Sequence, residues 1–138
     1  MLENIVIFSK ESKDVVLTAM YGELDPTTDT FADSLEKILE IAVKLDKGVF
    51  ILDLDNNFIA LILAIKDLSV SLVFNEEYEK KNQESWEKIA KEIINGFAKV
   101  FEIKSVSKYL EYKEKIDEII EWHKKELSPL DKMKDALW

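Results

Sequence analysis

The sequence predicts an α+β fold in which a five-stranded antiparallel sheet carries helices on both faces, in the order β-β-α-β-β-β-α-α. Three observations lead to this prediction. Two apolar runs of strand length precede an amphipathic helical segment, three more are joined by turns too short for a crossover, and the chain beyond residue 84 has helical periodicity. The expected strands and first helix are Glu3–Phe8, Val15–Tyr21, Phe31–Leu45 (the helix), Val49–Leu54, Phe58–Ile65 and Leu68–Phe74.

The first two strands form a predicted hairpin. The run from Asn4 to Phe8 is rich in β-branched residues, which predicts a strand buried on both faces and central in its sheet. The polar segment Ser9–Asp14 is the expected hairpin loop, and Val15–Tyr21 is the return strand. Gly22 is expected to end that strand because glycine takes positive φ at little cost.

The first helix has predicted signals at both ends. Asp25 is the expected N-cap, Pro26 suits the first helical position, and Gly48 marks the stop. The apolar positions between these signals are spaced as one helical face and are therefore expected to face the sheet. They are Phe31, Leu35, Ile38, Leu39, Ala42 and Leu45.

The next three strands are predicted to form an antiparallel meander. Val49–Leu52 is expected to be a buried strand, and Asn56-Asn57 tolerates the positive φ values of a tight turn. Lys66-Asp67 is the second turn. Leu68–Phe74 alternates between apolar residues and a face that carries two serines, so we expect one more polar face on that strand.

Helices are expected to complete the chain. Asn82 or Ser85 is the predicted cap of a helix whose apolar face includes Trp86, and Gly96 within it is expected to permit close packing. Ser105 or Ser107 begins a last helix, which Ser128-Pro129 breaks. We therefore expect a single domain over residues 1–127 and a short tail over residues 128–138.

Charge and composition exclude several classes of function. The chain has 138 residues, a net charge of −9 and no cysteine, so nucleic-acid binding and thiolate chemistry are not expected. Its 19 basic residues are all lysine, which removes the bidentate fork of arginine and fits an AT-rich genome or a heat-adapted source. There is no signal-peptide pattern, and no apolar run reaches the ~20 residues of a membrane span. We expect a cytoplasmic protein that does not insert into a membrane.

No motif predicts catalysis, a metal or a cofactor. Asp53 and Asp55 resemble the paired carboxylates of phosphotransfer hydrolases, but a hairpin follows them where that chemistry needs a parallel strand and a large loop. The same stretch lacks the glycine and the glutamate of a calcium loop. His123 is expected to be a packed, hydrogen-bonded side chain. Trp122 and Trp138 are the two interaction candidates, because exposed tryptophans are frequent interface anchors.

The element order resembles the longin fold of the SNARE-like superfamily, a profilin-like arrangement. The resemblance is carried by the opening Met1–Lys10, the helix Phe31–Leu45 and the meander Val49–Phe74. The opening is especially similar to the amino-terminal longin-type domains of signal recognition particle receptor alpha subunits. The resemblance covers about residues 1–103. It implies a non-catalytic scaffold that binds small GTPases, SNARE segments or tethering subunits, often as a homo- or heterodimer. It implies no catalytic residues, and the absence of a following heptad region argues against a fusion role.

Three functional hypotheses follow. The first is a protein-interaction scaffold or regulator that binds a small GTPase or a trafficking or tethering subunit, in a cell that we expect to be archaeal. The second is a small-ligand sensor, which predicts a sizeable apolar pocket with a few convergent polar groups between helix and sheet. The third is an enzyme that uses Asp53 and Asp55 with Mg²⁺.

Overall fold

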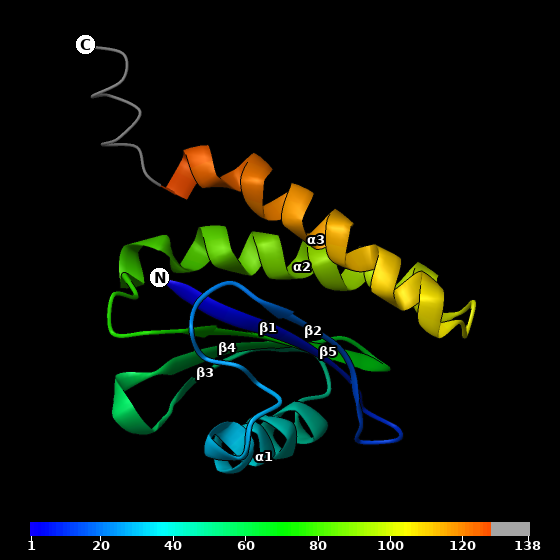
Figure 1. Ribbon diagram of the computed structural model, residues 1–138, viewed down its shortest axis with the longest axis horizontal. Helices are drawn as coiled ribbons and strands as arrows, with labels where there is room; N and C mark the ends of the chain where they lie inside the picture. Colours follow the sequence, from blue (N-terminus) through cyan, green and yellow to red (C-terminus); the bar gives the residue numbers. More distant parts are fainter. Residues whose placement is uncertain (128–138) are drawn as a thin grey trace.

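The computed structural model describes residues 1–127 and confirms the predicted fold class and element order (Figure 1). The strands are β1 (Leu2–Ser9), β2 (Val15–Met20), β3 (Gly48–Asp53), β4 (Ile59–Ala64) and β5 (Leu68–Phe74). The helices are α1 (Asp29–Lys44), α2 (Gln83–Phe101) and α3 (Val106–Leu127), with short 3₁₀ turns at Asp55–Asn57 and Lys80–Asn82. The predicted break at Ser128-Pro129 and the predicted tail lie outside the described residues.

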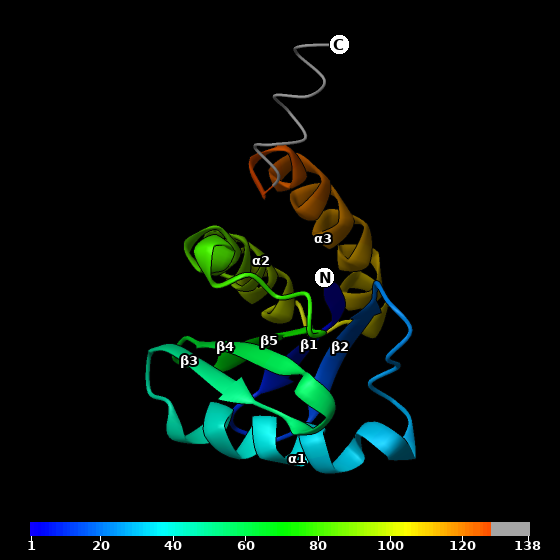
Figure 2. The ribbon, with the colours of Figure 1, turned by 90° about the vertical axis from the view of Figure 1, so that its left-hand side faces the viewer.

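The five strands form one antiparallel sheet in the order β2-β1-β5-β4-β3. Every residue of β1 is buried, and β1 pairs with β2 on one side and β5 on the other, which confirms the prediction of an interior strand. The middle strand is β5. The meander β3-β4-β5 is also confirmed. Figure 2 shows the resulting layers: α1 lies on one face of the sheet, and α2 and α3 lie on the other.

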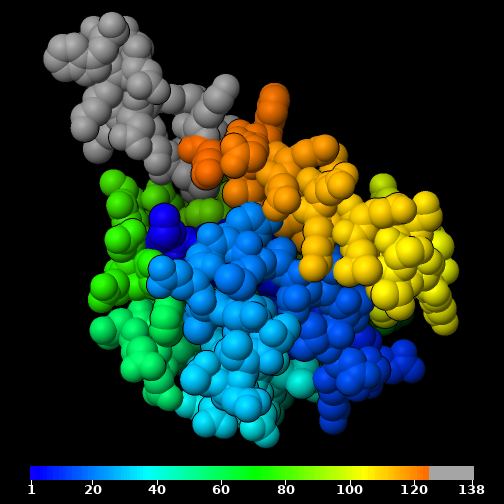
Figure 3. All heavy atoms as spheres, viewed as in Figure 1, coloured from blue at the N-terminus to red at the C-terminus, as the bar shows by residue number. Residues whose placement is uncertain are grey.

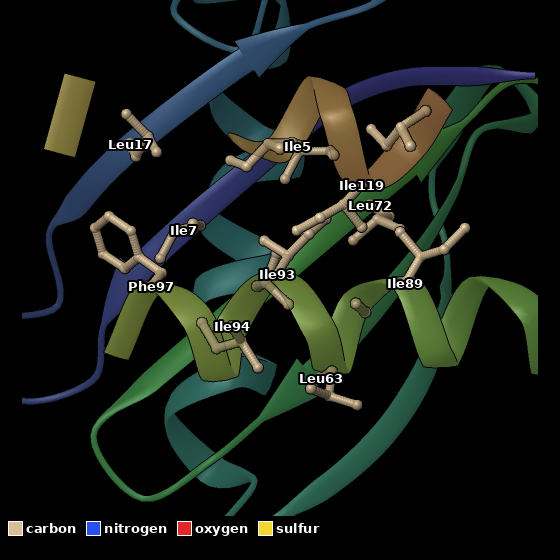
Figure 4. Close-up of a cluster of buried hydrophobic side chains, with 14 of the residues drawn as sticks. Ile5, Ile7, Leu17, Leu63, Leu72, Ile89, Ile93, Ile94, Phe97 and Ile119 are labelled. Carbon is tan, nitrogen blue, oxygen red and sulfur yellow. The ribbon is translucent and has the colours of Figure 1, made fainter. Parts of the chain in front are cut away.

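The larger core lies between the sheet and the pair α2 and α3 (Figure 4). Side chains from β1, β4 and β5 meet those of α2 at its centre, and α3 closes the cluster from outside. The side chains labelled in Figure 4 are Ile5, Ile7, Leu17, Leu63, Leu72, Ile89, Ile93, Ile94, Phe97 and Ile119. Burial of this set is the main source of stability, because each large aliphatic side chain contributes about 1.5–3 kcal/mol when fully buried.

A smaller core lies under α1. Phe31, Ile38 and Ala42 are buried on the inner face of α1, as the spacing predicts, and pack against Val6 and Ile62 of the sheet. The cap of this helix differs from the prediction. The helix begins at Asp29 rather than at Pro26, and Thr28 occupies the cap position.

The predicted cap Asp25 forms a local turn instead. Its Oδ1 atom accepts hydrogen bonds from the backbone N–H of Thr27 at 2.9 Å and from the Thr27 hydroxyl at 2.7 Å. These hydrogen bonds favour the charged carboxylate and lower the pKa of Asp25. The cap prediction was wrong because an aspartate followed by Pro-Thr can satisfy its oxygen within the turn before any helix starts.

The face of β5 that carries serines is buried rather than exposed. Ser69 and Ser71 lie in the layer under α1, where the Ser69 hydroxyl donates to the carbonyl oxygen of Leu63 at 3.2 Å. The hydroxyl of Ser71 and the Oδ1 atom of Asn4 are buried with no hydrogen-bond partner among the described residues. The alternation on β5 therefore assigns side chains to the two faces of the sheet correctly, but the face with the serines is not exposed to solvent.

Two glycines have different reasons for their identity. Gly22 does not adopt positive φ, so that prediction was wrong; a side chain there would overlap the carboxylate of Glu3. Gly96 confirms its prediction of close packing, because a Cβ atom there would overlap the hydroxyl of Tyr112 on α3. The turn prediction at Asn56-Asn57 is also confirmed, with φ values of 62° and 65°.

Lys10 connects the end of α1 to the sheet through hydrogen bonds. It lies in the loop after β1, and its ammonium group donates to three carbonyl oxygens, those of Leu45, Asp46 and Ile65. The first two follow the last turn of α1, and the third belongs to the turn between β4 and β5. A positive charge at the carboxyl end of a helix is favourable, because that end carries partial negative charge.

Candidate functional site

The two tryptophans that the sequence singles out have different outcomes. Trp122 lies on α3 and is 76% exposed, so it does not pack against the sheet. Trp138 lies outside the described residues. The third tryptophan, Trp86, lies on the inner face of α2 and packs edge-on against Phe74 at a centroid distance of 4.9 Å.

The acidic pair Asp53 and Asp55 lies at the exposed turn between β3 and β4. Asp55 makes a long contact of 3.8 Å with Lys37 of α1, and both side chains are mostly in solvent. Among the described side chains, residues 1–124, no three histidine, aspartate or glutamate side chains gather closely enough to hold a metal ion together. The predicted hairpin therefore places these carboxylates on an open corner rather than in a cleft.

His123 joins the two outer helices. Its Nε2 atom lies 2.8 Å from the carboxylate of Glu92 on α2, and its side chain is 14% exposed. This confirms the prediction of a packed, hydrogen-bonded histidine. The pair helps to fix α3 on α2, together with the Tyr112 hydroxyl, which donates to the carbonyl oxygen of Ile93 at 2.8 Å.

The first candidate site is the free edge of β3. Within the described part of the chain, this strand pairs only with β4. The sequence prediction of a buried strand at Val49–Leu52 was wrong, because its residues are exposed or half-buried. Val49 and Ile51 pack against the core beneath α2, and Leu52 packs against the core beneath α1. Phe50 is 40% exposed. The edge thus presents four consecutive apolar residues beside unpaired backbone groups.

The second candidate site is a pocket of about 910 Å³ beside the amino-terminal end of β1. Its walls come from the start of β1, the end of β2, the segment before α2 and the outer half of α3. In Figure 3 the dark-blue start of the chain lies next to the green segment that precedes α2, on the same side as the orange part of α3. Aromatic rings form its apolar part, notably Tyr21, Phe74, Tyr78 and Trp86.

Carboxylates surround this aromatic surface. Glu77 and Glu79 belong to the segment before α2, and Asp117 and Glu121 belong to α3. Asp117 accepts a hydrogen bond from the hydroxyl of Tyr21. Burial, then this hydrogen bond and the nearby negative charges, raise the pKa of Tyr21 far above its ordinary value. The phenol therefore stays neutral and keeps donating to Asp117.

Positive charge at the pocket is limited, and each cation already has a hydrogen-bond or ion-pair partner. Lys81, beside the pocket, pairs with Glu79 at 2.9 Å. Lys124 contacts Glu121 at 3.2 Å, and the amino group of Met1 donates to the side-chain oxygen of Asn75 at 3.1 Å. The pocket lining within the described residues thus holds four carboxylates against two cations. The sequence pattern gives no sign of this site, because Glu77 and Glu79 fall in a run of mixed charge before α2.

No known protein family matches this chain, and no curated protein is detectably similar to it. Among the described helices, none combines the length and the apolar composition that crossing a membrane requires.

Proposed function

We propose that this chain is a non-catalytic protein-interaction module that binds a strand of its partner along the free edge of β3. The single observation that carries the proposal is the composition of that edge. An unpaired edge strand is a template for pairing with another chain, and proteins usually protect it with lysine, proline, a bulge or a covering element. Between Val49 and Leu52, β3 has no charged residue and no proline, and its register with β4 is continuous.

The opposite edge of the sheet provides a contrast. β2 has a register shift in its pairing with β1 between Ile7 and Phe8. It also contacts α3, and Tyr21, which follows β2, is hydrogen-bonded to Asp117 of that helix. A bulge and a neighbouring helix are two of the devices that protect an edge. The exposed apolar edge of β3 is therefore the one suited to docking.

Addition of a strand would give affinity through backbone hydrogen bonds, while Phe50 and its neighbours would select the partner side chains. The longin resemblance of the sequence favours a small GTPase or a trafficking or tethering subunit as that partner. A second copy of this chain is the other candidate, because two antiparallel β3 edges are self-complementary. Both arrangements use the same edge and predict the same sensitivity to substitution.

The test is sedimentation velocity of the chain alone, and of the chain titrated with small GTPases, from micromolar to millimolar concentration. We expect a heavier species that Phe50→Lys abolishes, because a charge on an edge strand opposes pairing. Leu110→Lys is the matched control: Leu110 is an exposed apolar residue on α3, away from the edge, and its substitution should leave the species unchanged. A strictly monomeric chain with no GTPase complex, or equal effects of both variants, would contradict the proposal.

The alternative function, a small-ligand sensor, is favoured by one specific observation. The pocket of about 910 Å³ lies between helices and sheet, as that hypothesis predicts, and has the volume of a typical ligand site. The two functions use separate parts of the molecule. Either can therefore fail without the other.

A further inference from the structure

The pocket beside the start of β1 has a specific chemical character. It combines a hydrophobic floor with a rim of negative charge, and these come from segments far apart in the sequence. The floor includes Phe74, whose ring lies 5.0 Å from that of Tyr78 and 4.9 Å from that of Trp86. Phe74 itself is buried, so the half-buried rings of Tyr78 and Trp86 supply the aromatic surface that a bound group can reach.

The acidic residues of the rim come from two elements, the segment before α2 and α3. Glu77 makes no ion pair within the described part of the chain, whereas Glu79 pairs with Lys81 at 2.9 Å and Glu121 pairs with the exposed Lys124 at 3.2 Å. The excess of carboxylates over cations in the lining disfavours an anionic ligand. A cation would gain from these charges, from the aromatic faces and from the net charge of −9, which raises the local concentration of cations.

We propose that this pocket binds a small organic cation, one that carries an ammonium group on an apolar or aromatic body. The apolar body packs on Tyr78 and Trp86, and the ammonium group lies between the carboxylates of the segment before α2 and those of α3. Cations are attracted to the faces of tryptophan and tyrosine within about 6 Å of the ring centroid, so both parts of the pocket act on the same ligand. This site is independent of the β3 edge.

The test uses tryptamine and spermidine as probes, with indole-3-propionate as an anion that has the same ring as tryptamine. Binding is followed by isothermal titration calorimetry and by NMR of the Trp86 indole N–H, at low and at high salt. We expect at least one of the two amines to bind at up to millimolar concentration and to shift the Trp86 signal. Binding should be weaker at high salt, because salt screens the carboxylates. The propionate should not bind.

Two double variants with the same change in net charge distinguish binding at the pocket from general attraction of the amine to a negatively charged protein. Glu77→Gln with Glu121→Gln removes two charges from the rim and should weaken amine binding roughly tenfold. Glu111→Gln with Glu118→Gln removes two exposed charges of α3 outside the pocket and should leave binding unchanged. All four positions are exposed, so the variants should fold, which circular dichroism will check.

Several outcomes would overturn the proposal. They are no binding of either amine, equal binding of the propionate, equal losses in the two double variants, or amine binding that leaves the Trp86 signal unmoved. None of these results depends on whether the β3 edge pairs with a partner. Failure here and failure of the proposed function are therefore distinguishable.

Discussion

The hydroxyl of Tyr112 on α3 lies directly over Gly96 on α2 and donates a hydrogen bond to the carbonyl oxygen of Ile93, 2.8 Å away. The ring of Tyr112 also packs against Phe97, with the ring centroids 5.3 Å apart. The absence of a side chain at Gly96 is what allows this approach. The two helices are thus joined at a point where a glycine, usually unfavourable within a helix, is required by its neighbour.

Gly96→Ala should destabilise the protein by about 1–2 kcal/mol, although alanine is the better helix former by about 1 kcal/mol. The reason is the overlap of the new Cβ with the Tyr112 hydroxyl. Urea unfolding measures the change. In a Tyr112→Phe background the oxygen is gone and the nearest ring atom is 3.3 Å from the Cβ position, so the alanine should cost less there. Strict additivity of the two substitutions would contradict this contact.

Tyr112 also predicts a dependence on alkaline pH. Burial, followed by the negative charge of Glu92, raises the pKa of Tyr112 to about 12 from 10.0. A raised pKa means that folding favours the neutral phenol, so its contribution is complete below pH 10 and is lost as pH rises towards 12. That loss is on the order of 2 kcal/mol.

The measurement is urea unfolding of the wild-type chain and of Tyr112→Phe from about pH 8 to about pH 11. The variant should be less stable by about 1 kcal/mol at the lower pH, where it lacks the hydrogen bond, and the difference should shrink as the pH rises. Subtracting the two curves removes the titration of the lysines, which both proteins share. A difference in unfolding free energy between the two proteins that does not change with pH would contradict the raised pKa of Tyr112.

The serines of β5 make a matched pair under α1. Ser71→Ala removes a buried hydroxyl that has no partner among the described residues, and should leave stability unchanged or raise it by up to about 1 kcal/mol. Ser69→Ala removes a hydroxyl that donates to Leu63 and should cost about 0.5–1.5 kcal/mol. Thermal unfolding of the two variants compares them directly. Equal losses would show that the Ser71 hydroxyl has a favourable partner.

Lys10→Met should destabilise the chain by about 1.5–3 kcal/mol, since it leaves three carbonyl oxygens without their charged donor. Methionine keeps most of the apolar stem, so the loss reports on the ammonium group. Lys66→Met is the control, because Lys66 is an exposed turn residue whose substitution should change stability by less than about 0.5 kcal/mol. Similar values for both in urea unfolding would show that Lys10 is not a fastening point.

The fold was predictable because each element has a local signal. The spacing of Phe31, Ile38 and Ala42 gave the inner face of α1, and the short turns at Asn56-Asn57 and Lys66-Asp67 left only an antiparallel meander. The position of each strand within the sheet was harder to predict from the sequence. An apolar run predicts a buried strand whether the strand is interior, as β1 is, or at an edge, as β3 is, because hydrophobicity does not report which backbone groups are paired.

The residues of the pocket could not be identified from the sequence, for a different reason. Tyr21, Glu77 and Asp117 come from three distant segments, and each has an ordinary local explanation as a strand end, a charged loop or a helix surface. Only the packing of α3 over the end of β2 brings them together. Lys10 was likewise assigned to a polar loop, since nothing in its neighbourhood shows that three carbonyl oxygens converge on it.

The two faces of the sheet are covered unequally, and this sets an order of opening. Among the described elements, α1 is the one helix on its face of the sheet. It is held by the hydrogen bonds of Lys10 and by few fully buried side chains, and it covers the Ser71 hydroxyl, which has no partner among the described residues. Lifting α1 lets water reach that hydroxyl while the sheet, α2 and α3 remain assembled. Amide hydrogens of α1 should therefore exchange through a partial unfolding, at lower free energy than those of α2.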